Sequence, residues 1–354
     1  MTTFHPAFQC HGHSFKTPAM LCAFVREVSE ESAEFLDAWF DEKAYIEVQT
    51  SGSTGNPKRI QLHKFHMVNS AMSTGSYFNL GSGTKALLCL SPHFIAGKMM
   101  WVRALELGWN LDIAKNYSQP LEGVNSKYDF VAMVPLQVQQ SLLQLNQVQK
   151  LIVGGGVVSP QLRSSLQSLT TEVFATYGMT ETITHIAVQR LNRTKATHTA
   201  LYEALPSVEL STDERGCLVI DAAFVSEARV ITNDIVELHS KTRFRWVGRY
   251  DSIVNSGGVK LQPEAIEAKI GKVLNGRFMV CGIPDERLGE KLGLIVEGSK
   301  EAIDAKEAIQ TFLRGANLEK YEVPKVICFV DVFVLTETGK IQRAKTLKKC
   351  ELSC

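Results

Sequence analysis

The amino-acid sequence predicts an α/β protein with a large N-terminal domain of stacked mixed sheets and helices and a small mobile α+β domain at the C-terminus. Three observations support this fold class. Short apolar segments typical of strands alternate with amphipathic segments typical of helices. The length of 354 residues corresponds to about two domains. The last hundred or so residues contain a self-sufficient set of strand and helix patterns.

The N-terminal part of the chain shows this alternation element by element. Residues 29–43 carry a helical apolar stripe, formed by Phe35, Leu36, Trp39 and Phe40. Residues 44–50 alternate between apolar and polar, which predicts a half-buried strand. After a polar loop, a short strand at 59–63 and a helix from His66 are expected. Further strands are expected at 86–90, 130–134, 151–153, 171–175 and 217–220.

The C-terminal part begins near Asp251, so we expect one domain over residues 1–247 and another over 248–354. Pro263 stands where a helix would begin, because proline suits the first helical turn. Apolar side chains follow at helical spacing, at Ile266, Ile270, Val273 and Leu274. Strands are expected at 278–283, 292–297 and 326–332, with a second helix at 302–314.

Composition and charge exclude several classes of protein. Lys and Arg number 38 and Asp and Glu 37, and this balance argues against a nucleic-acid partner or an anionic membrane surface. No apolar run is long enough to insert into a membrane, and the first residues lack the pattern of a signal peptide. The eight cysteines are scattered without a CxxC pair, which is typical of reduced thiols. We therefore expect a globular protein located in the cytoplasm.

Residues 50–58 form a polar loop with the sequence TSGSTGNPK. Glycines let backbone N–H groups approach an anion closely, while hydroxyl groups add donors and a lysine adds positive charge. The loop is not a Walker loop, because Pro57, Lys58 and Arg59 replace the Gly-Lys-Ser/Thr ending. An ordinary polar turn is the alternative. The predicted phosphate-binding residues are Thr50, Ser51, Gly52, Ser53, Thr54, Gly55 and Lys58.

Further motifs follow in a fixed order along the chain: YGMTE at 177–181, TND at 232–234, GRYD at 248–251, PEAIE at 263–267 and TGKIQR at 338–343. Together with the loop, they make the sequence resemble the adenylate-forming superfamily of acyl- and aryl-CoA ligases, luciferases and adenylation domains. The resemblance implies that ATP and Mg²⁺ convert a small-molecule carboxylic acid into an acyl-adenylate, which coenzyme A then captures as a thioester. Asn233 stands where glycine is usual, which is tolerable because asparagine adopts left-handed conformations.

The resemblance also implies roles for the motif residues. Lys340 and Thr180 would be catalytic, and Glu181 would be catalytic and hold Mg²⁺. Nucleotide contacts would come from Gly154, Gly155, Tyr177, Gly178, Asp234 and Arg249. Gly257 and Gly258 would line the path of coenzyme A, and Asp251 would be the hinge. A surface charge at Glu181, an ion pair between Asp234 and Arg249, and a tight turn at the two glycines are the corresponding alternatives.

The acyl pocket is expected behind residues 91–97, where either His93 or Phe94 would face the acid. Arg103 lies in an otherwise apolar stretch, and such a basic residue needs a partner or an anionic ligand. Its position resembles that of an arginine in o-succinylbenzoate–CoA ligases of menaquinone biosynthesis, whose substrate has a second, aromatic carboxylate. A salt bridge at the rim is the alternative. Only 49 residues precede Thr50, so we expect a shortened large domain like that of these compact ligases.

Three functions compete at this stage. The leading one is an AMP-forming ligase that joins o-succinylbenzoate to coenzyme A, and another aryl or acyl acid is its nearest variant. The second is an adenylation enzyme that loads the thiol of a carrier protein. The third is a nucleotide-binding relative without activity, which the joint presence of Lys58, Glu181, Asp234, Arg249 and Lys340 disfavours.

Overall fold

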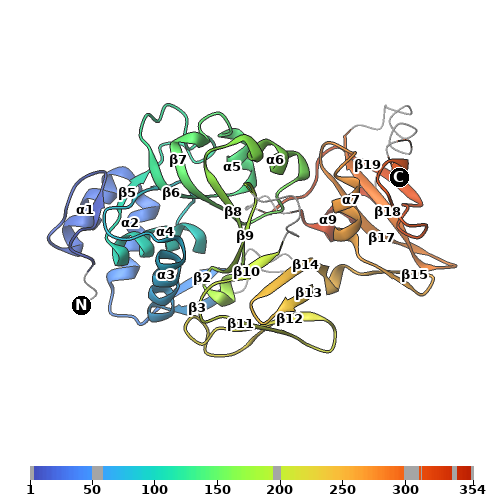
Figure 1. The fold of residues 1–354 in the computed structure, drawn as a ribbon, viewed down its shortest axis with the longest axis horizontal. Helices are drawn as coiled ribbons and strands as arrows, with labels where there is room; N and C mark the ends of the chain where they lie inside the picture. Colours follow the sequence, from blue (N-terminus) through green and yellow to red (C-terminus); the bar gives the residue numbers. More distant parts are fainter. Residues whose placement is uncertain are drawn as a thin grey trace.

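The computed structural model describes residues 4–49, 59–193, 201–298, 311, 313–336 and 341–351. It confirms the mixed α/β class: a long sheet flanked by helices occupies most of the molecule, and a second, smaller sheet lies at the end farthest from the N-terminus (Figure 1). No helix within these ranges is both long and apolar enough to cross a membrane.

The long sheet has 12 strands and changes from parallel to antiparallel at its middle. The parallel half runs in the order β1 (Gln9–Cys10), β5 (Asn110–Ile113), β4 (Lys85–Leu88), β6 (Tyr128–Met133), β7 (Val148–Val153) and β8 (Glu172–Gly178). The antiparallel half continues with β9 (His185–Arg190), β10 (Tyr202–Ala204), β14 (Arg243–Arg249), β13 (Val230–Ser240), β12 (Cys217–Asp221) and β11 (Glu209–Thr212). A separate hairpin pairs β2 (Tyr45–Gln49) with β3 (Arg59–His63).

Helices cover both faces of the parallel half, which explains its near-continuous apolar strands. Leu88 belongs to the core shared with α1 (Pro18–Val28), α2 (Glu30–Phe40), α3 (Lys64–Phe78) and α4 (Ile95–Leu107). Its neighbour Leu87 points to the opposite face, into the core shared with α5 (Pro135–Gln140) and α6 (Pro160–Ser165). Successive side chains of a strand alternate between faces, so one strand serves both cores.

The smaller sheet follows the order β16 (Val259–Leu261), β15 (Val254–Ser256), β18 (Gly289–Glu297) and β17 (Phe278–Asp285), with β19 (Val326–Val330) parallel to β18. Helices α7 (Pro263–Ile270) and α9 (Arg343–Glu351) accompany it. Strand β14 continues to Arg249, two residues beyond the boundary expected between 247 and 248, and the division into two domains stays a prediction. Most of the helix expected at 302–314 lies outside the described residues.

Candidate active site

Two motifs that are distant in the sequence meet at a buried carboxylate. The Tyr177 hydroxyl at the end of β8 donates to Asp234 Oδ2 on β13 at 2.6 Å. The indole N–H of Trp246 donates to the other oxygen, Asp234 Oδ1, at 3.2 Å. Asp234 is 8% exposed, and burial together with this carboxylate raises the pKa of Tyr177, which keeps its hydroxyl a donor at neutral pH. Both oxygens of Asp234 therefore have a fixed orientation.

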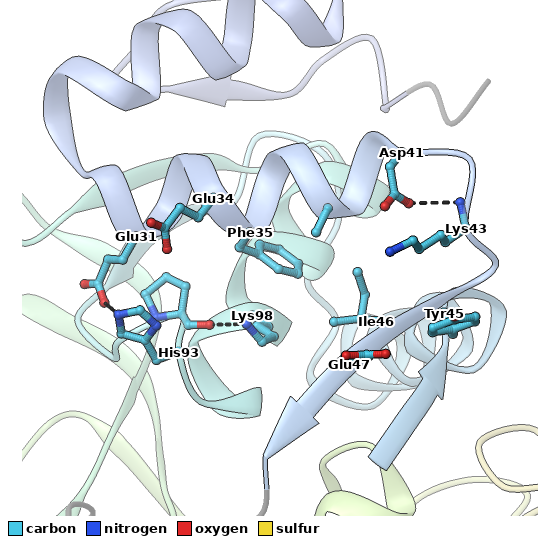
Figure 2. A pocket seen from close by; sticks show the side chains of 12 residues that line it. Glu31, Glu34, Phe35, Asp41, Lys43, Tyr45, Ile46, Glu47, His93 and Lys98 are labelled. Atoms are coloured by element: carbon cyan, nitrogen blue, oxygen red, sulfur yellow. Dashed lines mark hydrogen bonds and ion pairs between the residues drawn. The ribbon is translucent and has the colours of Figure 1, made fainter. Parts of the chain in front are cut away.

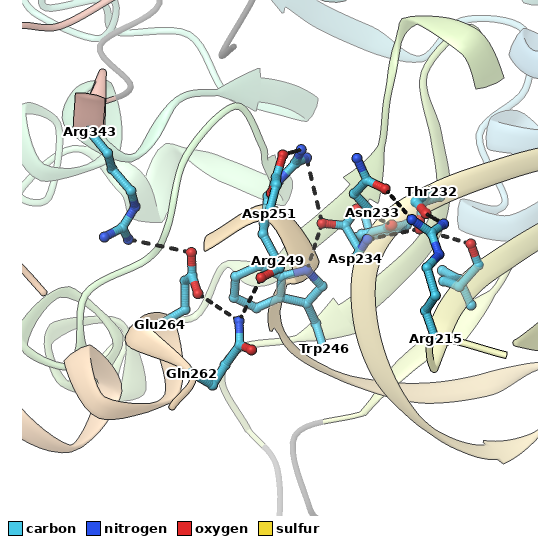
Figure 3. A network of polar contacts seen from close by, with 12 residues as sticks. Arg215, Thr232, Asn233, Asp234, Trp246, Arg249, Asp251, Gln262, Glu264 and Arg343 are labelled. Carbon is cyan, nitrogen blue, oxygen red and sulfur yellow. Dashed lines mark hydrogen bonds and ion pairs between the residues drawn. The ribbon is translucent and has the colours of Figure 1, made fainter. Parts of the chain in front are cut away.

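Arg249 joins this cluster from the neighbouring strand, since it lies opposite Asp234 in the β13–β14 register. Its Nη1 is 3.9 Å from Asp234 Oδ1, while Nε and Nη2 bind both oxygens of Asp251 at 2.8 and 2.6 Å (Figure 3). The hydrogen bonds from Arg249 lower the pKa of Asp251. The ion pair that the sequence left open for Arg249 is thus formed chiefly with Asp251.

Asn233 lies in the extended strand β13 and has no positive φ, so the left-handed conformations that would make asparagine tolerable at this position are not used. Its side-chain oxygen accepts a hydrogen bond from Arg215 at 2.9 Å, on the exposed side of the strand (Figure 3). A strand residue needs no special backbone freedom, and for this reason asparagine replaces glycine without strain here.

Thr180 and Glu181 lie in a single 3₁₀ turn, Thr180–Thr182, just past the end of β8. Glu181 is exposed, and no described side chain pairs with it. Gly178, the last residue of β8, has no room for a side chain, because a Cβ atom there would approach the carbonyl oxygen of Thr184 to 2.2 Å. The local chain thus brings a carboxylate without a described partner to the edge of the sheet where the parallel strands end.

Gly154 and Gly155 follow β7 at the same edge of the sheet. A Cβ atom on Gly154 would come within 2.5 Å of the Thr176 hydroxyl, and Gly155 has a φ of 77°. Both positions therefore keep the loop close to β8, next to Tyr177. This placement agrees with a nucleotide-facing loop, and the nucleotide contact itself stays a prediction.

His93 and Phe94 lie at the entrance to α4, beside a polar pocket of about 210 Å³ between α2 and β2 (Figure 2). His93 is mostly exposed and its Nε2 is 3.6 Å from Glu31, whereas Phe94 is half-buried and caps the helix. Lys98 of the same helix donates to the carbonyl oxygen of Pro92. A role of His93 or Phe94 at the acid stays a prediction.

Arg103 differs from these rim residues because it is 1% exposed in the core beside α3. Its Nε donates to the Thr74 hydroxyl at 3.3 Å and Nη1 contacts Met100 Sδ at 3.7 Å. Within the described ranges Nη2 has no partner. Burial lowers the pKa of Arg103 to about 9, so it remains a cation at neutral pH. The surface salt bridge considered from the sequence is therefore wrong.

Gly257 and Gly258 form the two-residue loop of the hairpin between β15 and β16, with φ values of 59° and 83°. Positive φ at both positions defines a tight hairpin turn that favours glycine. The turn alone accounts for this glycine pair, and passage of coenzyme A beside it stays a prediction. The loop 50–58 and Lys340 lie outside the described residues.

Trp246 and Arg343 are two residues whose contacts the sequence did not indicate. Trp246 holds Asp234, and Arg343 of the terminal motif binds Glu267 with two hydrogen bonds of 2.7 Å and the Val280 carbonyl oxygen at 2.8 Å. Arg343 thereby attaches α9 to α7 and β17. The pairing of β13 with β14 would have placed Trp246 near Asp234, but both strands were incompletely predicted.

Comparisons with known proteins identify the family. The model of the AMP-binding enzyme family matches residues 33–217, more than half of the chain, so the protein belongs to that family. The class is that of AMP-forming acid–thiol ligases, as the motifs predicted. The match ends within β12, after the segments that carry Arg103 and Glu181 and before Asp234.

Individual relatives extend the comparison along the chain. The 2-succinylbenzoate–CoA ligase of Listeria monocytogenes serovar 1/2a is 27% identical over 91% of this chain and 73% of its own length. The probable 2-succinylbenzoate–CoA ligase of Mycobacterium tuberculosis is 23% identical over 94% and 91%. A crystal structure of an AMP-forming acyl-CoA synthetase-like protein from Dyadobacter fermentans is 37% identical, with 90% and 93% coverage and a TM-score of 0.58. The o-succinylbenzoate CoA synthetase of Bacillus subtilis shares the fold, with 19% identity, 84% and 68% coverage, and a TM-score of 0.74.

Proposed function

We propose that this protein is an o-succinylbenzoate–CoA ligase, which uses ATP, Mg²⁺ and coenzyme A and releases AMP and pyrophosphate. The product is a thioester used in menaquinone biosynthesis. The buried guanidinium of Arg103, whose Nη2 has no partner among the described residues, is the observation that carries the substrate assignment. The curated relatives of the same name, which match over most of the chain, support it.

The nucleotide would bind at the carboxylate of Asp234. An ionised carboxylate is acceptor-only and has about four lone-pair sites, of which Tyr177 and Trp246 use two. The remaining sites suit the two hydroxyl groups of a ribose. Arg249 is already paired with Asp251. Its remaining N–H groups would donate to ribose or phosphate oxygens. The loop 50–58 would hold the β- and γ-phosphates.

Glu181 fits a magnesium ligand by its chemistry. Mg²⁺ is usually bound by one or two carboxylates together with waters and substrate phosphates, so a single exposed glutamate is sufficient. When bound, the ion would neutralise the phosphate charge that opposes attack by a carboxylate. Thr180 would donate its hydroxyl to the α-phosphate, one residue away along the same turn. Lys340 would contact the acid carboxylate and a phosphate oxygen.

The acid would extend from this turn toward Arg103. Its succinyl carboxylate attacks the α-phosphorus, a P–O bond forms, and pyrophosphate leaves, which gives the acyl-adenylate. The thiol of coenzyme A then attacks the acyl carbon, loses its proton, and expels AMP. The first half-reaction joins two anions, and the second must position a thiol nucleophile. Alignment and charge neutralisation would therefore supply most of the rate enhancement. Rotation of residues 248–354 about Asp251 would exchange Lys340 for the thiol, which would approach past Gly257 and Gly258.

Arg103 would neutralise the aromatic carboxylate of o-succinylbenzoate. A buried unpaired charge is destabilising, and its presence is explained if a substrate anion completes the pair. A monocarboxylic acid would leave the guanidinium unpaired. This difference predicts a strong preference for an acid with a second carboxylate.

Pyrophosphate exchange into ATP tests the proposal. Exchange should be much faster with o-succinylbenzoate than with 4-oxo-4-phenylbutanoate, which lacks only the ring carboxylate, or with benzoate and fatty acids. Adding free coenzyme A should then give the thioester. Preference for a simple monocarboxylic acid would refute the substrate assignment. Exchange without thioester formation would indicate a carrier-protein thiol, and no exchange with any acid would indicate a non-catalytic relative.

A further inference from the structure

Two buried nitrogen atoms without partners lie in the same part of the core. One is Nη2 of Arg103 on α4, and the other is Nε2 of His185 at the start of β9. His185 is 5% exposed, and neither atom has a hydrogen-bond partner among the residues that the structure describes. Buried polar atoms are almost always paired, so these two nitrogens need an explanation.

The backbone before His185 is held in a strained conformation. Ile183 has φ and ψ of 64° and −62°, which is rare for a β-branched residue, and the Thr184 N–H donates to the Thr182 carbonyl oxygen at 2.7 Å to close a three-residue turn. The Thr182 side chain fastens this turn, with hydrogen bonds to the N–H of Met179 and the carbonyl oxygen of Thr184. Strain of this kind persists where the surrounding contacts fix it, often at functional sites.

The turn joins His185 to the segment that carries Thr180 and Glu181. His185 lies opposite Gly178 in the β8–β9 ladder, and only the turn separates it from Glu181. Its ring is 6.4 Å from that of Phe78 on α3, the helix whose Thr74 contacts Arg103. An acid activated beside Thr180 would have to extend inward from this turn to reach both nitrogens.

We propose that His185 is a second specificity-determining residue, whose Nε2–H binds the distal anionic group of the acid together with Arg103. This inference rests on the proposed function and adds a residue to it. Arg103 supplies the positive charge, and His185 supplies a directed hydrogen bond to one carboxylate oxygen.

The charge state of His185 suits this role. Burial, and to a smaller extent the charge of Arg103, lower the pKa of His185 well below its usual value. The imidazole is therefore neutral when the site is empty, and it avoids repulsion with the guanidinium while still offering one N–H donor. A carboxylate has two oxygens and can accept from both residues at once.

The test compares o-succinylbenzoate with 4-oxo-4-phenylbutanoate by pyrophosphate exchange in the full chain. His185→Leu removes the donor, and His185→Asn is a second variant whose shorter amide does not reach the position of Nε2. Both should lower kcat/KM for o-succinylbenzoate about tenfold or more, because a hydrogen bond to a charged group is lost. Both should change kcat/KM for the monocarboxylic acid less than threefold. His185→Gln, whose amide nitrogen lies near the Nε2 position, should restore much of the preference.

The outcomes separate this inference from the proposed function. If the wild type prefers o-succinylbenzoate and the variants keep that preference, or lose both acids equally, the role of His185 is refuted while the function stands. If the wild type activates a different dicarboxylic acid and the His185 variants lose that preference, the inference stands and the named substrate is wrong. A wild type that prefers monocarboxylic acids overturns both.

Discussion

The Tyr177 hydroxyl donates to Asp234 Oδ2 at 2.6 Å, and this bond joins the last parallel strand of the long sheet to its antiparallel half. The rings of Tyr202 and Phe244 pack against Tyr177 with centroids 5.8 and 5.1 Å away. These aromatic contacts hold the Tyr177 ring in place, and the Tyr177 hydroxyl in turn orients the Asp234 carboxylate. In the proposed function, the nucleotide site would thus be oriented by residues that need not touch the nucleotide.

Replacing Tyr177 by phenylalanine should raise KM for ATP about tenfold and change kcat little. The change removes a hydrogen bond to a buried charge, an effect of about 1.5–3 kcal/mol, while Trp246 still holds the other oxygen. The measurement is pyrophosphate exchange at varied ATP. Tyr202→Phe is the matched control, since it keeps the ring contacts and should leave KM for ATP unchanged. Equal effects of the two variants would contradict the role of the Tyr177 hydroxyl.

Asp251→Asn should lower Tm slightly at pH 7, because a partly exposed ion pair of this kind contributes less than about 1 kcal/mol to the free energy of unfolding. Because Arg249 holds the folded-state pKa of Asp251 below its unfolded value of about 3.9, the stabilisation is present above that value and is lost as the pH falls through the folded pKa. Thermal unfolding of both proteins from pH 7 to pH 3 should show a constant difference in Tm down to about pH 4. Below that pH the difference should shrink. A difference that grows as the pH falls would contradict this assignment.

Glu181→Gln should lower pyrophosphate exchange by about a hundredfold or more and raise the Mg²⁺ concentration needed for half-maximal rate, because a neutral amide is a weak ligand for this ion. The residue is exposed, so the fold should be unaffected. A Mg²⁺ titration of the exchange rate measures the change. Glu122→Gln alters another exposed glutamate and should behave like the wild type. An unchanged Mg²⁺ requirement in Glu181→Gln would exclude the proposed ligand.

The sequence predicted the parallel half of the fold well because its strands are apolar on both faces and its helices carry an apolar stripe. In that half, Lys85–Leu88, Tyr128–Met133, Val148–Val153 and Glu172–Gly178 all overlap predicted strands. Outside it, the hairpin strands Tyr45–Gln49 and Arg59–His63 match their predicted ranges within a residue, and the helix beginning at Pro263 starts where proline indicated. The antiparallel half was largely missed. Glu209–Thr212 has one buried residue, and half of Val230–Ser240 is exposed, so neither shows a strong apolar pattern.

Residues of the candidate site that belong to short sequence motifs were predictable. Residues that join the site only through strand pairing or core packing were not. Glu181 and Asp234 were identifiable from the motifs around them. Trp246 and His185 were not, because their importance arises from cross-strand contacts with Asp234 and from a core shared with Arg103. A sequence shows a lone tryptophan or histidine, and only the fold shows which carboxylate or cation it faces.

Arg103→Met should stabilise the ligand-free protein while abolishing its preference for a dicarboxylic acid. Burial holds the pKa of Arg103 at about 9 in the folded state, below its unfolded value, so the charge destabilises the fold fully below pH 9. A methionine of similar shape removes that penalty, which for buried ions is about 1–4 kcal/mol, and Tm should rise by about 2 °C or more. Thermal unfolding at pH 7 measures the change in stability. Pyrophosphate exchange with o-succinylbenzoate and with 4-oxo-4-phenylbutanoate measures the change in acid preference. A lower Tm would show that Arg103 is paired in the folded protein.

Lys340→Ala should reduce adenylation by at least a thousandfold and leave conversion of a supplied acyl-adenylate to the thioester nearly unchanged. A lysine that neutralises charge between the acid and the α-phosphate acts only in the first half-reaction, since the thioester step expels AMP without bringing two anions together. Each half-reaction is measured separately, by pyrophosphate exchange and by thioester formation from synthetic o-succinylbenzoyl-adenylate. Lys345→Ala is the matched control, because Lys345 is an exposed lysine of α9 five residues further on. Equal loss of both half-reactions in Lys340→Ala would show that the residue serves the fold or the nucleotide in general, and the proposed exchange of lysine for thiol would have to be abandoned.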